Sequence, residues 1–281
     1  MFEVAIVGAG ELGGALAHRL ARRNATRAIT LIDDSGRAAE GKALDIAQAA
    51  AVEQFATSVA GTGDVARAAG AAIVVLADPF GTDGEWHGEE ALMRLRRLVQ
   101  LAPRAVVIGA GAMHRDLVET GVRELNIDRR RLFGTAPDAL VSGARALIAL
   151  ALDGSPRDVR VAVLGVPPSR TVVAWEDATI AGCRVSGLIA EPVRRALAAQ
   201  IIALWPPGPH ALAAAAAHAI EAMTGRSRSL ATCFVAPETS GGVSTRTAAL
   251  PVRLGPLGIN EFVAPVLSVA ERVALENAML L

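Results

Sequence analysis

Tyrosine is absent from this chain of 281 residues, aromatic residues make up 3% of it, and Lys42 is its single lysine. Together with the heavy use of alanine and arginine, these scarcities indicate a bias in base composition, and we assign them no function. Cysteine is scarce as well, since Cys183 and Cys233 lie far apart and form no CxxC motif. Structural thiols are therefore expected rather than a disulfide, and no metal site is predicted.

Charge of one sign is not in excess, because 28 Lys and Arg residues balance 28 Asp and Glu residues. A chain without a basic surplus is poorly suited to neutralise the phosphates of DNA or RNA, so no nucleic-acid partner is expected. No apolar run reaches the length that spans a membrane, and the N-terminus has no signal-peptide pattern. We therefore expect no membrane partner and a cytoplasmic location.

The most informative feature that is present is the turn Gly8-Ala9-Gly10-Glu11-Leu12-Gly13. A strand-like apolar run precedes this turn, a helix-like segment follows it, and Asp33 lies 20 positions beyond Gly13 at the end of a second strand-like run. This context predicts a dinucleotide-binding βαβ unit. A glycine-rich turn in an unrelated α/β protein is the alternative. The predicted cofactor-binding residues are Gly8, Gly10, Glu11, Leu12, Gly13, Asp33 and Ala77.

Each residue type in this pattern has a physical reason. Gly8 permits a tight turn, Gly10 lets the backbone approach a pyrophosphate, and Gly13 allows close packing of the helix on the strand. The start of the helix offers free amide donors and the positive end of its dipole. Asp33 can accept hydrogen bonds from a ribose diol and would repel a 2′-phosphate. NAD is therefore favoured over NADP.

The alternation of elements predicts an α/β fold. Strands are expected at residues 2–7, 28–32, 54–59, 71–77 and 105–108, and helices at 36–50, 89–101 and 113–125. This order is typical of a doubly wound parallel sheet with helices on both faces, that is, a Rossmann-type domain over residues 1–136.

The pattern changes in the second half, which predicts an α+β domain over residues 137–281. Helices are expected at 138–152, 191–204 and 210–223, with a closing helix from about residue 263, and strands at 159–164, 172–175, 230–235 and 243–254. No low-complexity linker separates the halves, so they are expected to share an extensive interface.

This order of elements resembles the lactate/malate dehydrogenase family. The segments Glu40-Gly41-Lys42-Ala43-Leu44-Asp45 and Ala249-Leu250-Pro251-Val252-Arg253-Leu254-Gly255, the latter followed by Gly258-Ile259, look like patterns of that family. The resemblance covers nearly the whole chain. It implies an NAD-linked oxidoreductase acting on a small 2-hydroxy or 2-keto acid, and a homo-oligomer of two or four subunits.

The catalytic residues that the resemblance implies are missing. The family places a histidine, which takes the substrate's hydroxyl proton, in a turn that here reads Gly165-Val166-Pro167-Pro168-Ser169. Its Asp and Arg partners would fall near Leu140 and Gly143, whereas Asp138 comes slightly early and has Val141 at the Arg spacing. The expected oxidoreductase chemistry lacks its usual acid/base and carboxylate clamp.

Two histidines are candidates for a relocated site. His87 falls where the family's mobile loop carries an arginine, and His210 lies in a turn that faces the substrate in the family. A solvated loop residue and an ordinary helix-start residue are the alternatives. The catalytic residues are therefore left unknown.

Other polar residues receive structural interpretations. His218 is expected to be a surface or packing residue on a helix. Ser227, Ser229 and Ser240 lie in a polar, glycine-rich stretch without a histidine or acid nearby in sequence, so loop solvation is expected. Two functions consequently stay open: an NAD-linked dehydrogenase with an altered residue set, and a catalytically silent NAD-binding homologue with a regulatory or structural role.

Overall fold

A computed structural model describes residues 2–82, 84–238 and 246–280 of the chain. Its helices are α1 (Glu11–Arg22), α2 (Gly36–Glu53), α3 (Gly88–Leu101), α4 (Arg115–Leu125), α5 (Ala136–Ala151), α6 (Val185–Leu188), α7 (Glu191–Ile202), α8 (Pro209–Met223), α9 (Val269–Met279) and the 3-10 helix η1 (Val65–Ala68). Its strands are β1 (Glu3–Val7), β2 (Ala28–Ile32), β3 (Ser58–Thr62), β4 (Ile73–Leu76), β5 (Val106–Gly109), β6 (Leu132–Gly134), β7 (Val159–Arg160), β8 (Val163–Val166), β9 (Arg170–Val173), β10 (Thr179–Ile180), β11 (Cys183–Arg184), β12 (Ala231–Val235), β13 (Ala248–Gly255) and β14 (Gly258–Phe262).

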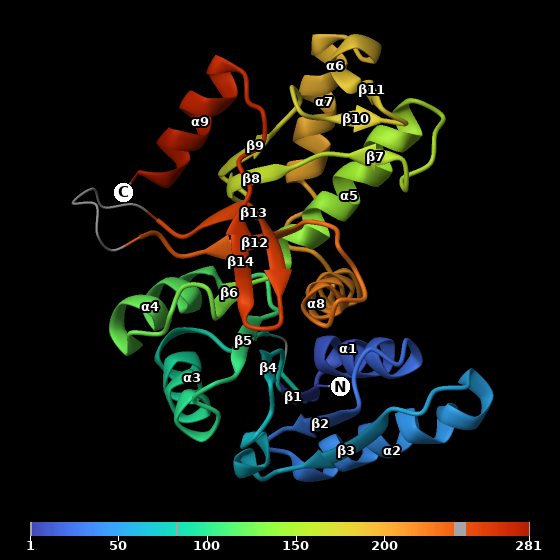
Figure 1. Ribbon diagram of the computed structural model, residues 1–281, viewed down its shortest axis with the longest axis vertical. Helices are drawn as coiled ribbons and strands as arrows, with labels where there is room; N and C mark the ends of the chain where they lie inside the picture. The colour runs from blue at the N-terminus through green and yellow to red at the C-terminus, as the bar shows by residue number, and fades with distance from the viewer. Residues whose placement is uncertain (1, 83, 239–245, 281) are drawn as a thin grey trace.

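The N-terminal half is a parallel sheet of order β3-β2-β1-β4-β5-β6, as the alternation of elements predicts. Successive residues of β1 point to opposite faces: Val4 and Ile6 pack with α1, α2 and α8, whereas Ala5 and Val7 pack with α3 and α4. Both faces are covered, which explains why these strands are continuous apolar runs. Figure 1 shows this half in blue, teal and green, in the lower part of the molecule.

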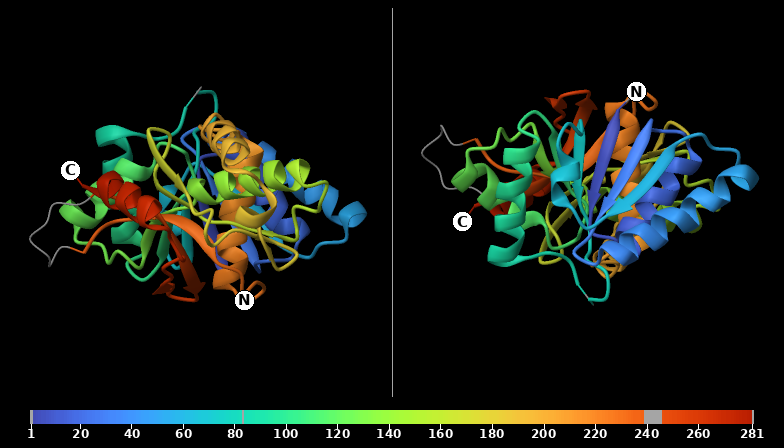
Figure 2. Two further views of the ribbon diagram at one scale, coloured as in Figure 1. Left: turned by 90° about the horizontal axis from the view of Figure 1, so that it is seen from above. Right: turned by 90° about the horizontal axis from the view of Figure 1, so that it is seen from below.

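The sheet continues into the C-terminal half without a break. Strand β12 pairs antiparallel with β6 through Phe234 and Gly134, and β13, β8 and β9 follow in order. A separate sheet contains β11, β10 and β7. Helix α8 packs against both α1 and α5 and so lies between the two halves (Figures 1 and 2). The α/β fold with a C-terminal α+β part is confirmed, while the boundary at residue 136 stays a prediction.

Several predicted elements differ from the structure. The strand expected at 159–164 is two strands, β7 and β8, which belong to separate sheets. The strand expected at 54–59 begins only at Ser58, because α2 extends to Glu53 and ends at Gln54 in a left-handed conformation. The helix expected from residue 263 begins at Val269, where Ser268 and Glu271 form a capping box. Residues 258–262 instead form β14, which pairs with β13. The strand expected at 243–254 begins at Ala248, and its residues 243–245 lie outside the described residues.

Across residues 2–82, 84–238 and 246–280, no helix is both long and apolar enough to span a bilayer. Both cysteines are free; Cys183 is exposed and Cys233 is buried.

Replacing Phe234 with Ala is expected to destabilise the chain by about 3–5 kcal/mol, because it empties a fully buried site. Phe234 has 0% exposure, packs against Gly134 of the neighbouring strand, and makes an edge-to-face contact with Trp205 at 5.9 Å between ring centroids. Denaturant unfolding followed by circular dichroism measures the change. Leu150→Ala is the control, since Leu150 is 80% exposed; an equal loss in both variants would contradict this account.

Candidate functional site

The glycine turn connects β1 to α1 in the way the sequence predicts. Gly8 has a φ of +109°, and a side chain there or at Gly13 would overlap backbone atoms, of Asp78 for Gly8 and of Gly8 itself for Gly13. Ala77, at the end of β4, is buried beside Gly13. The backbone is therefore shaped for close approach at the start of α1.

The backbone amides at the start of α1 bind a carboxylate of the chain itself. Asp78, in the loop between β4 and α3 (residues 77–87, with 83 outside the described residues; hereafter the β4–α3 loop), accepts hydrogen bonds from the backbone N–H of Leu12 at 3.1 Å and of Gly13 at 2.9 Å. A Cβ atom on Gly10 would overlap this carboxylate. Asp78 thus lies where the sequence predicts a pyrophosphate, on the amides at the positive end of the helix dipole.

Asp33 is engaged in a similar manner. Its Oδ2 accepts from the backbone N–H of Ala9 at 2.8 Å and of Phe80 at 2.9 Å, and its Oδ1 accepts from Ser35 at 2.9 Å. The residue is 4% exposed. In this conformation of the β4–α3 loop, both oxygens that would receive a ribose diol are satisfied by backbone amides.

A second carboxylate holds the far end of the loop. Glu85 accepts from the N–H of Ala112 at 2.7 Å and of Met113 at 2.8 Å, in the turn between β5 and α4. A Cβ atom on Gly111 would overlap the Glu85 carboxylate. Asp78 and Glu85 therefore each bridge two consecutive amides, and together they fasten the loop across the carboxyl edge of the sheet.

A cavity of about 570 Å³ lies beside the fastened loop. It is lined by Gly10, Glu11 and Leu12 of the glycine turn, by loop residues, and by Pro207, Pro209 and Leu212 from the other half. Lys42 also lines it and donates to the carbonyl oxygen of Gly10 at 2.7 Å. The single lysine thus places a positive charge at the edge of the predicted cofactor site.

His87 and His210 are not brought together at this cavity. Both are exposed, and neither lines it. The Nδ1 atom of His87 lies 2.9 Å from the carbonyl oxygen of Glu85, and His210 lies in the first turn of α8. Among the described residues, neither ring is hydrogen-bonded to an acidic side chain, and their catalytic role stays a prediction.

The positions where the resemblance implies catalytic groups hold none within the described residues. The turn after β8 contains Pro167 and Pro168 and contributes no residue to the 570 Å³ cavity. Leu140 is buried in the core, and Gly143 packs against Leu204.

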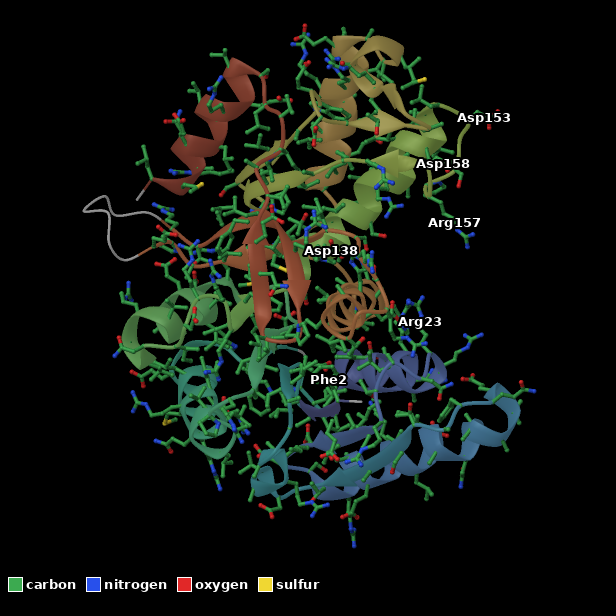
Figure 3. The ribbon with its side chains drawn as sticks, in the orientation of Figure 1. Phe2, Arg23, Asp138, Asp153, Arg157 and Asp158 are labelled. Carbon is green, nitrogen blue, oxygen red and sulfur yellow. The ribbon has the colours of Figure 1, made fainter. Side chains whose placement is uncertain are left out.

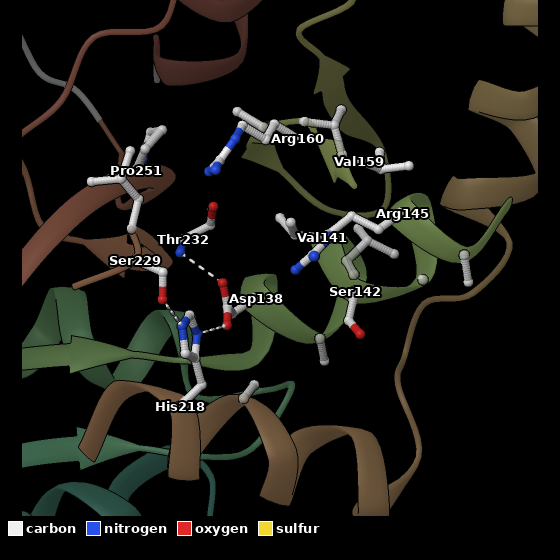
Figure 4. A pocket seen from close by; sticks show the side chains of 18 of the residues that line it. Asp138, Val141, Ser142, Arg145, Val159, Arg160, His218, Ser229, Thr232 and Pro251 are labelled. Atoms are coloured by element: carbon white, nitrogen blue, oxygen red, sulfur yellow. Dashed lines mark hydrogen bonds and ion pairs between the residues drawn. The ribbon is translucent and has the colours of Figure 1, made fainter. Parts of the chain in front are cut away.

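The structure instead assembles a polar group that sequence reasoning missed. Asp138 in the first turn of α5, His218 on α8 and Ser229 before β12 line a larger cavity of about 1060 Å³ (Figure 4). Figure 3 marks the position of Asp138 in the whole molecule. His218 Nδ1 lies 2.6 Å from Asp138 Oδ2, and its Nε2 lies 2.6 Å from Ser229 Oγ. Ser229 is exposed in the loop before β12, as expected, and His218 lies half-buried on α8. Their hydrogen bonds were not predicted, because they join residues 80 and 11 positions apart. Ser240 lies outside the described residues.

The pKa of His218 is raised above its ordinary value of 6.5 by the hydrogen bond to Asp138, and burial opposes this rise. Further contributions come from Asp138 and Glu221, which raise the pKa, and from Arg145, which lowers it. Asp138 is itself fixed, since its Oδ1 accepts from the N–H of Thr232 at 3.0 Å.

Comparisons with known proteins agree with this fold. Residues 2–82 match the family model described as lactate/malate dehydrogenase, NAD binding domain. A malate dehydrogenase of Chlorobium phaeobacteroides is 25% identical over 293 residues, which cover 98% of this chain and 94% of the relative. One of Flavobacterium johnsoniae is 25% identical over 279 residues, covering 93% and 90%. Along nearly its whole length, the chain is thus similar to malate dehydrogenases, and its first 82 residues carry the match to the NAD-binding domain of the lactate/malate dehydrogenases.

Solved structures show the same fold over the whole length. The malate dehydrogenase from Salinibacter ruber has a TM-score of 0.85 at 21% identity and covers 98% of this chain and 93% of its own. A lactate dehydrogenase from Cryptosporidium parvum, in complex with lactic acid and NAD, has a TM-score of 0.86 at 22% identity and covers 99% and 94%. These structures show the fold, and the match of residues 2–82 to an NAD-binding domain supports NAD as the cofactor.

The residues present fit NAD in part. The glycine turn and the buried Ala77 match the cofactor's needs, whereas the Asp78 carboxylate fills the space above Gly10 and holds the amides of Leu12 and Gly13. NAD and the Asp78 carboxylate cannot share these donors. The cofactor therefore requires a conformation in which Asp78 has left the start of α1.

His218 is expected to stabilise the fold more at low pH than at high pH. Because its pKa in the folded chain lies above the unfolded value, the protonated pair with Asp138 contributes fully below about pH 6.5. This contribution is lost as the pH rises through the raised pKa. Thermal unfolding of the unmodified chain and of His218→Gln between pH 5.5 and 9 measures the difference, which is expected to shrink with rising pH. His87→Gln is the control, and a gap that widens with pH would contradict the assignment.

Proposed function

We propose that this protein is an NAD-binding homologue that has lost ordinary turnover of malate and lactate, and in which the β4–α3 loop competes with NAD for the amides of α1. The observation that carries the proposal is the Asp78 carboxylate on the N–H groups of Leu12 and Gly13. NAD is then a ligand that exchanges with a segment of the chain, which suits a regulatory or structural role.

The energetics of this exchange favour the closed loop. Hydrogen bonds to a charged group contribute about 1.5–3 kcal/mol each, and Asp78 and Glu85 accept two apiece. When a pyrophosphate displaces Asp78, it forms new hydrogen bonds to the start of α1. The displaced Asp78 carboxylate, however, regains only hydrogen bonds to water. A weak affinity for NAD follows, limited by the loop rather than by the glycine turn.

The missing proton-transfer group supports the loss of turnover. A positioned acid or base contributes about 10²–10⁴-fold to such a reaction, and an electrostatic clamp about 10²–10³-fold more. The turn at Pro167 has no titratable side chain, and Leu140 and Gly143 supply neither the Asp nor the Arg that the family uses. When bound, NAD supplies a hydride acceptor, but the histidine that takes the hydroxyl proton in the family is replaced by the proline turn at residues 165–169.

An altered dehydrogenase is the second candidate. His87 and His210 are the residues that would carry it, and their exposure to solvent favours the silent homologue over it. A dimer or tetramer and a cytoplasmic location, both expected from the sequence, stay part of this proposal; light scattering coupled to size exclusion tests the first.

Replacing Asp78 with Asn is expected to tighten NAD binding by about tenfold or more, because an amide can accept from only one of the two N–H groups and carries no charge. Isothermal titration with NAD measures the dissociation constant. Asp116→Asn is the matched control, since the Asp116 side chain is 77% exposed on α4. An unchanged affinity in Asp78→Asn would refute competition by the loop, and no NAD binding in either variant would refute the proposal as a whole.

Reduction of oxaloacetate or pyruvate is expected to be at least about 10⁴-fold slower than with an ordinary malate or lactate dehydrogenase, as both the acid and the clamp are missing. The decrease in NADH absorbance at 340 nm measures the rate, with an ordinary malate dehydrogenase added afterwards as a positive control. Measurable reduction that His87→Ala or His210→Ala abolishes would favour the altered dehydrogenase instead.

A further inference from the structure

The larger cavity, of about 1060 Å³, is not explained by NAD binding. Its lining comes from the C-terminal half, mainly from α5, α8, the segment before β12, and residues 263–266. Its volume suits a small organic molecule. The 570 Å³ cavity beside the glycine turn shares only Pro207 with it.

Three side chains in this cavity have the contacts of a nucleophilic triad. Ser229 Oγ lies 2.6 Å from His218 Nε2, and His218 Nδ1 lies 2.6 Å from Asp138 Oδ2 (Figure 4). This is the order of contacts in serine hydrolases, where the hydroxyl meets one ring nitrogen and the carboxylate the other. Such a triad is recognised by geometry, because it recurs on unrelated folds.

Burial and secondary contacts suit each member to its role. Asp138 is 11% exposed and is held by the N–H of Thr232, so its carboxylate is fixed and shielded. An ionised carboxylate only accepts, which places the imidazole proton on Nδ1 and leaves Nε2 to accept from Ser229. Ser229 is exposed, and its Oγ also lies 2.5 Å from Ser227 Oγ. The nucleophile is therefore accessible, while its base is oriented.

Arginines add positive charge to the same cavity. Arg145 and Arg160 point their guanidinium groups into it from the side opposite His218 (Figure 4). Arg145 is anchored, because its Nε donates to the carbonyl oxygen of Pro156 at 3.0 Å. Arg157 also lines the cavity. Its acidic lining residues are Asp177 and Asp138, and Asp138 is paired with His218. The balance of charge favours an anionic ligand.

We propose that Ser229, His218 and Asp138 form an ester-hydrolysing site whose substrates are esters carrying a carboxylate. This activity is independent of NAD and of the family's dehydrogenase chemistry.

The reaction involves no oxidation or reduction. Ser229 Oγ attacks the ester carbonyl carbon while its proton passes to His218 Nε2, and the carbonyl oxygen becomes negatively charged as a tetrahedral intermediate forms. The carbon–oxygen bond to the alcohol then breaks, and the alcohol leaves with the proton from Nε2. Water attacks the acyl-Ser229, gives a proton to Nε2, and releases the acid as Ser229 regains its hydrogen. Asp138 stays ionised and bonded to Nδ1–H throughout.

Hydrolysis of the 4-nitrophenyl monoester of succinic acid by the full-length chain tests the proposal, with release of 4-nitrophenolate followed by absorbance. The unmodified chain is expected to turn over the ester, and Ser229→Ala to lose at least about 100-fold. His218→Gln is expected to lose a comparable factor. Ser58→Ala, on β3 in the other half of the molecule, is the matched control for a serine substitution. Thermal unfolding verifies that each variant folds.

Two further measurements separate a catalytic site from a structural hydrogen-bond network. A fluorophosphonate probe is expected to modify Ser229, as located by peptide mass spectrometry. Arg160→Gln is expected to raise the KM for the succinic monoester at least about fivefold and to leave the KM for 4-nitrophenyl acetate unchanged. The proposal is overturned by absence of hydrolysis in the unmodified chain, by modification at another residue, or by equal rates in Ser229→Ala.

Discussion

The unsatisfied amides at the start of a helix need an acceptor, and in this protein the chain supplies its own. Asp78 meets the N–H groups of Leu12 and Gly13, and the rest of the site follows from that contact. It directs the next residues over Asp33, whose oxygens then accept from Phe80 as well as from Ala9. A fold built to hold a dinucleotide therefore has a closed state that needs no ligand.

The two cavities are lined by different kinds of polar side chain. The one beside the glycine turn holds the groups expected of a nucleotide site, and no histidine is among its lining residues. The other holds a hydrogen-bonded base and a hydroxyl but no residue of the N-terminal half among its lining. Helix α8 passes close to both, since Leu212 lines the first and His218 the second. One helix thus contributes to two sites with different chemistry.

Much of the fold could be predicted from the sequence, because it depends on local patterns. The apolar runs from β1 to β5 and the spacing of Gly8, Gly10 and Gly13 define the parallel sheet without knowledge of distant contacts. The contacts of Asp78 could not be predicted in this way, since they join residues 65 and 66 positions apart. The same holds for Asp138 and His218, which meet only once α5 and α8 have packed. Strand β14 was missed because it depends on pairing with β13, whereas the capping box at Ser268 was a readable signal for the true start of α9.

The pairing of β6 with β12 has a mechanical consequence. Backbone hydrogen bonds join the two halves into a single sheet, so neither half can rotate against the other without breaking the sheet and exposing Phe133 and Phe234. A molecule can therefore reach the carboxyl edge of the sheet only when the β4–α3 loop is displaced, while the two halves keep their relative positions. The rate of binding at that edge would therefore depend on how readily about ten loop residues open, and not on a hinge motion between the two halves.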